Sequence, residues 1–496
     1  MSATLGRSPA GSSPTKTPPT GSPPPGAGRD AASGGGVEQH GYDYIPESDR
    51  YMTPRQLGLF WMGINAYQFF FVLGSIAVGM GLSLVQAIIA IACGNLLFGV
   101  VAYCSVAGPR AGMPTTAFSR AAFGVLGNRV NAVCTWAMSL GFKTVNGLLG
   151  VFAMLALFDQ LGWHDSGGAL GKVVATVVVL GGSIVIAVYG HRALVRVQPY
   201  FAAAVTLIFL LIVGNIVGDV DWGWKPDDPA TGWGGVALVL IACALISSGP
   251  LSYMVVAPDY ARYLPSGTPT RKIFRAVFAG GAGMVMFLGT VGAVAATRAD
   301  LSDPVAGMEP LLPGWLFVLY IVASFTGAVG NNASVFYSSG LAIQAIGIPA
   351  RRWVATAVDA MLALAAVLWV LFIYDFEHAL NEFLALVVVW AGPFCAVWIT
   401  DGVMRRWTYD RESVHISTPA SRYWGTAGVN VAGIVSMLAG MATALLTINS
   451  ALVKGWLSTR MDGADLSWFL PLIVSAAAYA VLGRRWVRET SLPAAA

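Results

Sequence analysis

The sequence predicts an all-α integral membrane protein with about twelve transmembrane helices. Of its 496 residues, 56% are hydrophobic and only 11% are charged, whereas a typical soluble domain carries about 25% charged residues. Windows of about 20 mostly apolar residues, long enough to cross a bilayer as a helix, recur along the chain. The chain also contains 58 glycines, and glycine is commoner in membrane helices than in soluble ones. The lipid bilayer is therefore the expected surroundings of most of the chain.

The twelve expected spans follow from these apolar windows. They cover residues 56–81, 83–107, 128–158, 172–190, 195–218, 233–257, 272–297, 313–345, 353–373, 383–400, 425–450 and 467–483. The third and eighth windows exceed the thickness of a bilayer, so we expect these two helices to tilt or to include turns outside the membrane.

Basic residues test the number of spans independently. If both termini are cytoplasmic, nearly all lysines and arginines between the spans fall on the cytoplasmic side. The exceptions are Lys172, Lys225, Arg298, Lys454 and Arg460. This is the positive-inside bias of membrane proteins, and a missed or additional helix would destroy it. We therefore expect a multi-pass protein of the plasma membrane with cytoplasmic N- and C-termini.

The segment 1–50 differs in composition from the rest of the chain. It is rich in Pro, Gly and Ser and has almost no large apolar residues. Such a segment buries too little surface to offset the entropy lost on ordering, so we expect a disordered cytoplasmic tail.

Other features argue against nucleic-acid binding, metal binding and catalysis. The formal net charge of +4 is small and gives no reason to expect a nucleic-acid partner. The five cysteines lie in apolar runs without Cys-x-x-Cys or Cys/His spacing, so neither a metal site nor a disulfide framework is expected. No GxSxG, HExxH or P-loop motif is present. We expect neither enzymatic activity nor a cofactor.

Three spans are predicted to be interrupted inside the membrane. The sixth span contains Gly249–Pro250, and proline removes a backbone donor and clashes with the preceding turn. The first and eighth spans carry clustered amides and small residues. The polar residues at the three places are Asn65 and Gln68 in the first span, Ser248, Ser252 and Tyr253 in the sixth, and Asn331 and Asn332 in the eighth.

Interrupted helices bind solutes because they leave N–H and C=O groups free near the middle of the bilayer. The first and sixth spans are five apart, as a five-plus-five inverted repeat requires. These features predict a secondary transporter of a small-molecule substrate. The alternative is that the same residues only pack helices closely or form hydrogen bonds between them.

Two charged residues lie well inside predicted spans, Lys143 in the third and Asp359 in the ninth. A charge there is costly and normally faces a cavity or a partner. Lys143 either contacts an acceptor on the substrate, carries a proton or has a structural role, and Asp359 either pairs helices or transfers a proton. Phe142 and Asn146 lie one turn apart on one face of the third span, which suits a flat heterocycle that forms hydrogen bonds.

Three motifs resemble the nucleobase–cation symporter family, in its purine–cytosine permease-like branch. They are AGPRAGMPTTAFSRAAFG after the second span, GPLSYMVVAPDYARYLP at 249–265 and VWAGPFCAVWITDGVMRRWTYD at 389–410. The first covers the polar segment 108–124, which we expect to be a cytoplasmic loop or a short helix under the bundle. The last corresponds to a proline-broken helix ten in the family. The resemblance covers about 55–410, with the motifs in the family's order.

The resemblance implies a five-plus-five inverted-repeat, LeuT-like transporter fold. The core of helices one to ten then occupies residues 51–424, with the repeats at about 56–218 and 233–400. Two peripheral helices lie within 425–483, and 484–496 form a cytoplasmic tail. Family members move cytosine, purines, uracil, hydantoins, allantoin or related vitamins with a proton or sodium gradient.

The resemblance also assigns roles to residues of the expected site. It implies that Phe142 stacks on the substrate and that Asn146 hydrogen-bonds it. The sixth-span contribution maps to Gly249–Tyr253, and the eighth-span amides map to Asn331 and Asn332. Many relatives carry tryptophan at the position of Phe142, and they often carry asparagine at the position of Val335.

Coupling to protons is favoured over coupling to sodium. Sodium-coupled members present hydroxyls where this chain has Val329 and Gly330, and a hard cation prefers oxygen ligands. The leading hypothesis is a proton-coupled importer of a nucleobase such as cytosine or a purine, with Lys143 and Asp359 as candidates for coupling. The alternative is a same-fold sodium- or proton-coupled transporter of allantoin, a hydantoin, a vitamin or an amino acid. A channel would show charged rings or a filter motif, and neither is visible. The sequence predicts no oligomeric state.

Overall fold

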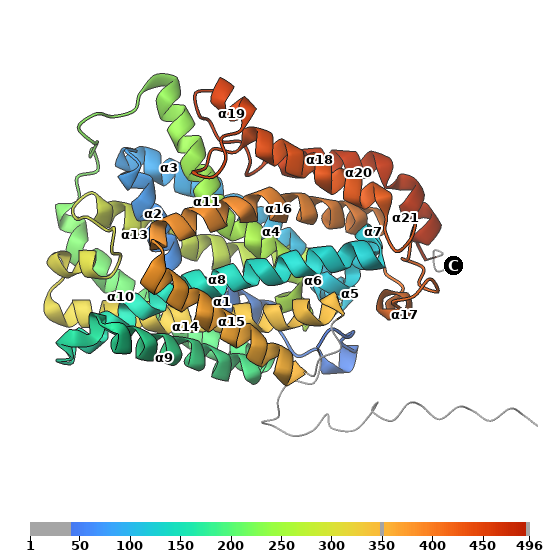
Figure 1. Ribbon diagram of the computed structural model, residues 1–496, viewed down its shortest axis with the longest axis horizontal. Coiled ribbons are helices and arrows are strands. Elements are labelled where there is room, and N and C mark those ends of the chain that lie inside the picture. Colours follow the sequence, from blue (N-terminus) through green and yellow to red (C-terminus); the bar gives the residue numbers. More distant parts are fainter. Residues whose placement is uncertain (1–40, 348–351, 493–496) are drawn as a thin grey trace, which may run out of the picture. The chain divides into compact units, whose positions relative to one another are not determined.

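The computed structural model describes residues 41–347 and 352–492, and within them the regular elements are helices and two isolated β-bridges. Figure 1 shows most long helices running roughly side by side. The first ten are α1 (Pro54–Asn65), α2 (Gln68–Gly79), α3 (Leu84–Asn95), α4 (Phe98–Cys104), α5 (Ala107–Ala111), α6 (Thr115–Phe118), α7 (Arg120–Phe123), α8 (Val125–Gln160), α9 (Ala169–Val188) and α10 (His191–Ile216).

The remaining elements follow the same pattern of long apolar helices and short connecting ones. They are α11 (Gly232–Ala261), α12 (Thr270–Val277), α13 (Gly283–Ala296), α14 (Gly314–Ile346), α15 (Arg352–Ile373), α16 (Phe376–Met404), α17 (Arg411–His415), α18 (Val431–Thr447), α19 (Trp456–Arg460), α20 (Leu470–Leu482) and α21 (Arg484–Thr490). A π-helical turn at Phe278–Ala282 joins α12 to α13, and 3₁₀ helices cover Glu47–Asp49, His164–Gly167, Val217–Asp219 and Ala306–Leu311.

The all-helical membrane fold is confirmed. Among the described residues, nine helices are long and apolar enough to cross a membrane, and two bent pairs, α1 with α2 and α20 with α21, bring the number to eleven. The shorter apolar helix α18 has 17 residues. Every predicted span overlaps one of these elements, so this arrangement is compatible with twelve spans.

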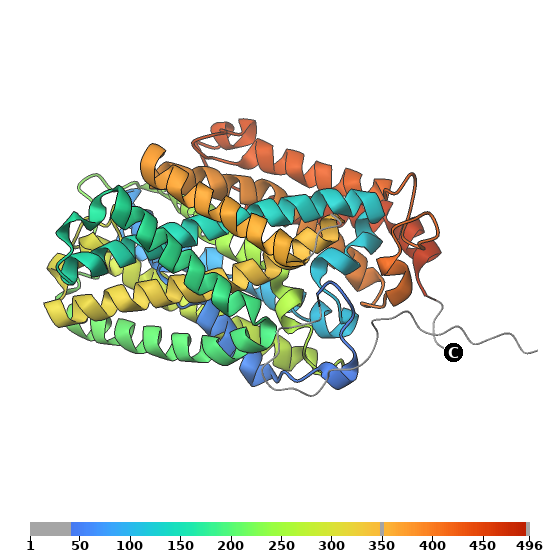
Figure 2. The ribbon, with the colours of Figure 1, turned by 60° about the horizontal axis from the view of Figure 1, so that its bottom comes forward.

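The helices α8 and α14 form the centre of the fold. They contain 36 and 33 residues, about 54 and 50 Å at 1.5 Å per residue, and therefore extend beyond a hydrocarbon core of about 30 Å. They pack against each other along their lengths, and Figures 1 and 2 show α8 in cyan and α14 in yellow crossing the bundle together. Polar side chains at their mid-points therefore face a buried interface.

The predicted interruption of the first span is confirmed. The helix α1 ends at Asn65, α2 begins at Gln68, and their axes meet at an angle of 54°. The two residues between them, Ala66 and Tyr67, are not helical. The backbone groups at this break lie next to the cavity described below.

The predicted interruptions of the sixth and eighth spans were wrong. The helix α11 continues through Pro250 and Pro258, and α14 continues through its polar cluster. A proline removes one hydrogen bond, but every residue of α11 from 246 to 261 is buried, so packing on all sides holds the helix. In α14 the side chains of Asn331, Asn332, Ser338 and Ser339 bond to neighbouring helices, while Ser334 donates to the carbonyl of Gly330 in its own helix. The expected break of helix ten is also absent, because α16 continues through Pro393.

Two terminal segments contain ordered residues, and the first of them, 41–50, was predicted to be disordered. Residues 41–50 pack against the helices: Ile45 is fully buried, and its N–H donates to the carbonyl of Gly112 at 2.8 Å. The C-terminal tail begins with the helix α21. Both segments carry enough large side chains to bury surface. Residues 1–40 of the predicted tail lie outside the described residues.

The polar segment 108–124 forms short helices, in agreement with the prediction. The helices α5, α6 and α7 follow one another here, and residues 111–125 are all buried. Thr115 donates through its backbone N–H and its hydroxyl to Asp259 at the end of α11, at 2.8 and 3.2 Å. These hydrogen bonds hold the segment 108–124 against the end of α11.

Candidate functional site

A small cavity lies at the break between α1 and α2, near the mid-points of α8 and α14. The cavity volume is about 30 Å³, enough for about two water molecules, so its walls lie close together. The residues that line it are Tyr67, Phe69, Phe70, Met138, Ser139, Phe142, Gly249, Ser252, Tyr253, Val256, Tyr260, Asn331, Val335 and Ser338.

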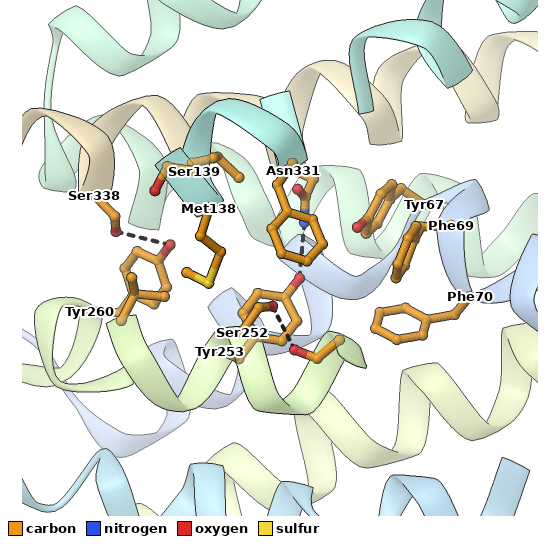
Figure 3. Close-up of a pocket in the computed structure, with 14 residues that line it drawn as sticks. Tyr67, Phe69, Phe70, Met138, Ser139, Ser252, Tyr253, Tyr260, Asn331 and Ser338 are labelled. Carbon is orange, nitrogen blue, oxygen red and sulfur yellow. Dashed lines mark hydrogen bonds between the residues drawn. The ribbon is translucent and has the colours of Figure 1, made fainter. Parts of the chain in front are cut away.

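The cavity has an aromatic end and a hydroxyl end. Figure 3 shows Tyr67, Phe69 and Phe70 grouped on one side, while Ser338 and Tyr260 lie on the other. The Ser338 hydroxyl donates to the Tyr260 hydroxyl at 3.1 Å. No charged side chain belongs to the lining. The cavity therefore offers ring faces and neutral polar groups to a ligand.

Asn331 of α14 connects three elements beside the aromatic end. Its Nδ2 donates to the carbonyl of Ile64 at the end of α1 (2.5 Å) and to the hydroxyl of Tyr253 on α11 (3.0 Å). A carbonyl can only accept, so this bond fixes the orientation of the amide. Asn331 Oδ1 then accepts from Asn146 Nδ2 on α8 at 2.7 Å. The Oδ1 of Asn146 is buried without a hydrogen-bond partner, so it remains available as an acceptor.

The first N–H groups of α2 are further polar groups at this place. The first four N–H groups of a helix lack intrahelical partners, and no side chain caps α2. Phe69 and Phe70, which line the cavity, belong to this first turn. The positive end of the helix dipole therefore lies next to the aromatic end of the cavity.

Five of the residues expected to bind substrate line the cavity, and the others do not. Those in the lining are Phe142, Gly249, Ser252, Tyr253 and Asn331. The others bond to the protein: Asn65 Nδ2 donates to Trp61 O (2.7 Å), Gln68 Nε2 to Tyr320 Oη (2.6 Å), Ser248 Oγ to Leu245 O (2.5 Å) and Asn332 Nδ2 to Lys143 O (3.3 Å), while Asn146 bonds to Asn331. Of these, Gln68, Asn332 and Asn146 connect helices, whereas Asn65 and Ser248 bond to carbonyls of their own helices.

Lys143 and Asp359 form a buried ion pair behind the cavity wall. Lys143 Nζ bonds to Asp359 Oδ1 and donates to Ser339 Oγ at 3.0 Å. Asp359 also accepts from Trp136 Nε1 and from Ser339 Oγ, both at 2.9 Å. Lys143 Nζ lies 4.9 Å from the centre of the Phe336 ring. Neither charged residue belongs to the lining, so Asp359 neutralises the lysine rather than leaving its charge to a substrate.

Sequence reasoning missed several lining residues that share a helix face with predicted ones. Ser139 lies three residues before Phe142, and the same face of α8 carries Met138. Tyr260 and Ser338 lie seven residues after Tyr253 and Asn331, which is about two helical turns. This spacing is a signal that could have identified them. The residues of the first turn of α2 gave no such signal.

The carbonyl oxygens at the end of α1 already have hydrogen-bond donors. Those of Gly63 and Asn65 accept from the N–H groups of Ala66 and Tyr67 at 3.1 and 2.9 Å, and that of Ile64 accepts from Asn331. The residues Val329 and Gly330 on α14 add no side-chain oxygen. In the described part of the chain, no three His, Cys, Asp or Glu side chains gather at one place.

Comparisons with known proteins show the family to which the chain is similar. Residues 44–470 match the model of a protein family described as permeases for cytosine/purines, uracil, thiamine and allantoin. The chain is 24% identical over 456 residues to YxlA of Bacillus subtilis (strain 168), named as a purine-cytosine permease, across 90% of this chain and 96% of YxlA. It is 25% identical over 352 residues to the cytosine permease of Escherichia coli (strain K12), across 67% of this chain and 74% of that permease.

A solved structure shares the fold. Mhp1, a nucleobase-cation-symport-1 family transporter in a closed conformation with bromovinylhydantoin bound, superposes with a TM-score of 0.76 at 16% identity. The superposition covers 92% of this chain and 97% of Mhp1. The expected five-plus-five inverted-repeat, LeuT-like fold is therefore confirmed.

Proposed function

The chain belongs to the family of permeases for cytosine/purines, uracil, thiamine and allantoin, and we propose that it imports a nucleobase such as cytosine or a purine through the cavity at the α1–α2 break. It is a membrane transporter and not an enzyme. The substrate is carried by alternating access, in which the cavity opens to one side of the membrane and then to the other. Both termini lie in the cytoplasm of a cell whose plasma membrane holds the protein.

The single observation that supports this substrate class is a cavity lined by aromatic rings and by no charged side chain. Six of the lining residues are aromatic: Tyr67, Phe69, Phe70, Phe142, Tyr253 and Tyr260. Offset or edge-to-face ring contacts each contribute about 0.5–1.5 kcal/mol beyond the burial of area. A planar neutral heterocycle gains these contacts on its faces without leaving a charge unpaired.

The edge of a nucleobase finds complementary polar groups around the same cavity. A ring carbonyl of the substrate can accept from the free N–H groups at the start of α2, and ring N–H or amino groups can donate to hydroxyl oxygens of Ser252 and Ser338. Both hydroxyls donate to protein acceptors, Gly249 O at 2.7 Å and Tyr260 Oη at 3.1 Å, so their lone pairs remain for a ligand.

Proton coupling is the better-supported form of symport. A sodium ion prefers several oxygen ligands, and Val329 and Gly330, where sodium-coupled relatives are expected to present hydroxyls, offer no side-chain oxygen. The ion pair of Lys143 and Asp359 is a titratable group inside the membrane. Lys143 of this pair directly follows Phe142 on α8. Ser339, which bonds to both charged side chains, directly follows Ser338 on α14. A proton taken up or released by this pair can therefore alter the wall of the cavity.

The alternative substrates fit less well. An amino acid or another carboxylate would meet the partial positive charge at the start of α2 but no charged side chain in the lining, because the buried Lys143 is neutralised by Asp359. Allantoin and hydantoins share the N–H and C=O edge of a nucleobase but lack an extended aromatic system, so they gain less from the ring faces. Coupling to sodium instead of protons remains the second candidate for the driving ion.

Uptake measurements test the substrate assignment. Cells that lack their own nucleobase transporters and express this protein are supplied with labelled cytosine, adenine, hypoxanthine, uracil and allantoin. We expect saturable uptake of at least one nucleobase, inhibited by unlabelled nucleobases, and none above background in cells with the empty vector. Uptake of none of the five, with no competition among them, would contradict the proposal.

A further inference from the structure

The break between α1 and α2 has no cause in its own sequence. The two residues at the break are Ala66 and Tyr67, and neither glycine nor proline is present between Asn65 and Gln68. Alanine is the strongest helix former, and tyrosine is only slightly weaker than average. Tyr67 nevertheless adopts an extended conformation, with φ −155° and ψ 168°. The cause of the break must therefore lie in what packs against it.

One face of α14 packs against the break. It carries Tyr320, Gly327 and Asn331, which are separated by seven and four residues. These separations correspond to about two turns and one turn of a helix, so the three residues share a face. We call this face the α14 cradle. Tyr320 and Asn331 are both buried, with exposed fractions of 0% and 2%.

The middle of the cradle leaves room for the break. A Cβ atom added at Gly327 would lie 2.5 Å from Ala66 O and 2.8 Å from Tyr67 Cβ. Real Cβ atoms do not approach other atoms so closely, and the first of these is a backbone oxygen that cannot rotate away. Any side chain at this position would displace the two non-helical residues, so glycine here sets how near the break comes to α14.

The two ends of the cradle hold the two halves of the broken helix. Asn331 donates to Ile64 O at the end of α1 at 2.5 Å. Tyr320 Oη accepts from Gln68 Nε2 at the start of α2 at 2.6 Å, and it donates to Pro304 O at 2.6 Å. Gln68 is buried, with 1% exposed, and does not line the cavity. Each half is thus held by a separate hydrogen bond, on either side of Gly327.

We propose that the α14 cradle sets the bend between α1 and α2 and thereby places the aromatic wall of the cavity. The wall residues Tyr67 and Phe69 flank Gln68 in the chain. A change in the position of the Gln68 side chain therefore moves both. Gln68 and Tyr320 are positioning residues, in contrast to the substrate contact that the sequence predicts for Gln68. The proposal rests on the proposed function only in its choice of a nucleobase as the probe.

A matched pair of glycine variants tests the proposal. Gly327→Ala places a methyl group against the break, whereas Gly340→Ala on the same helix meets nothing within 4 Å. We expect Gly327→Ala to weaken nucleobase binding at least tenfold and Gly340→Ala to change it less than twofold, with similar thermostability in detergent. Equal affinities for the two variants would overturn the proposal.

A double-mutant cycle covers the case in which Gly327→Ala does not fold. Tyr320→Phe keeps the ring and removes the hydroxyl that accepts from Gln68, and Gln68→Leu removes the amide. If Gln68 acts through Tyr320, each single variant weakens binding about three- to tenfold and the double variant is little worse than either. If Gln68 contacts the substrate directly, the two losses multiply, and that result would overturn the positioning role.

A measurement without substrate separates this proposal from the proposed function. Spin labels are attached at Gly79, the end of α2, and at Gly314, the start of α14, where nothing lies within 4 Å, with the five native cysteines replaced. We expect Gly327→Ala to shift or broaden the distance distribution between the labels, and Gly340→Ala to leave it unchanged. If the wild-type protein binds no nucleobase, the proposed function fails, but this distance still decides whether the cradle holds the bend.

Discussion

The cavity and the ion pair of Lys143 with Asp359 of α15 both involve neighbouring residues of α8 and α14, yet they differ in charge and in open space. Phe142 of α8 and Ser338 of α14 line the cavity, while the next residue on each helix, Lys143 and Ser339, bonds to Asp359. One region is neutral and aromatic and has a small open space. The other is charged and fully bonded, with 0% of the lysine side chain exposed.

This difference shows how one helix pair can serve two tasks. Successive residues on a helix point about 100° apart, so neighbours in the chain can face opposite sides of the α8–α14 interface. The solute is kept away from a fixed charge that would favour anions. The titratable pair is kept away from solvent, where its response to the substrate would be screened. The variants below probe whether the two regions are separate in function as they are in space.

The largest effect is expected from breaking the ion pair. Lys143→Met leaves the Asp359 carboxylate buried without its cation, which costs about 3–5 kcal/mol of stability. We expect a marked loss of folded protein in detergent, measured by thermal unfolding and size-exclusion chromatography. The double variant Lys143→Met/Asp359→Leu removes both charges, and we expect it to recover most of the stability.

The double variant also distinguishes coupling from structure. If the pair carries the coupling proton, the double variant binds substrate and exchanges it across the membrane, but does not accumulate it against a gradient. Normal proton-driven accumulation by the double variant would show that the pair only connects helices. Such a result would place coupling elsewhere.

Asn146→Ala is expected to have the second largest effect. This variant is expected to alter substrate binding in the cavity and not the ion pair. The Asn146 amide is the donor to Asn331 Oδ1 at 2.7 Å, and a buried acceptor left without a partner costs about 1–3 kcal/mol. We expect binding of the nucleobase to weaken about 10- to 100-fold, measured as Kd on purified protein. Thr144→Val on the same helix removes a hydroxyl that bonds only to Leu140 O, and should leave Kd unchanged. Unaltered affinity of Asn146→Ala would refute its role.

Phe142→Leu is expected to have the smallest effect of the series. The ring of Phe142 packs edge-on against Phe383, with centroids 4.9 Å apart, and it supplies one face of the cavity. Loss of a single ring contact costs about 0.5–1.5 kcal/mol, so we expect Kd to rise about two- to tenfold. The control is Phe152→Leu, ten residues along α8 and outside the lining, which should not alter Kd. A similar change in both variants would contradict stacking by Phe142.

Composition and apolar windows were sufficient to predict the membrane spans, and the family resemblance predicted the fold, but most of the helix breaks were predicted wrongly. Apolar windows and basic residues predicted the helices because both signals depend on the bilayer and not on tertiary contacts. Breaks do depend on tertiary contacts. Pro250 is a local defect that the burial of α11 on all sides overcomes, whereas the non-helical Ala66–Tyr67 faces Gly327 of a helix far away in the chain.

Dependence on tertiary contacts also decided which site residues could be predicted from the sequence. Phe142 was predicted because its helix face suits a planar ligand, and Tyr253 and Asn331 were predicted because they cluster with other polar residues inside apolar spans. The bonds of Gln68 to Tyr320 and of Lys143 to Asp359 could not be found, because nothing in the chain states which spans are neighbours. A polar residue inside a membrane has the same appearance in the sequence whether it binds a solute or another helix.

Solute accumulation in proteoliposomes under defined ion gradients tests the central claim most directly. The purified protein is reconstituted with a labelled nucleobase from the uptake panel, first with an inward proton gradient in sodium-free buffer, then with an inward sodium gradient at equal pH. We predict accumulation with the proton gradient alone, abolished by a protonophore, and none with the sodium gradient. Accumulation that needs sodium and persists with the protonophore would contradict proton coupling, and no accumulation under either gradient would contradict nucleobase symport itself.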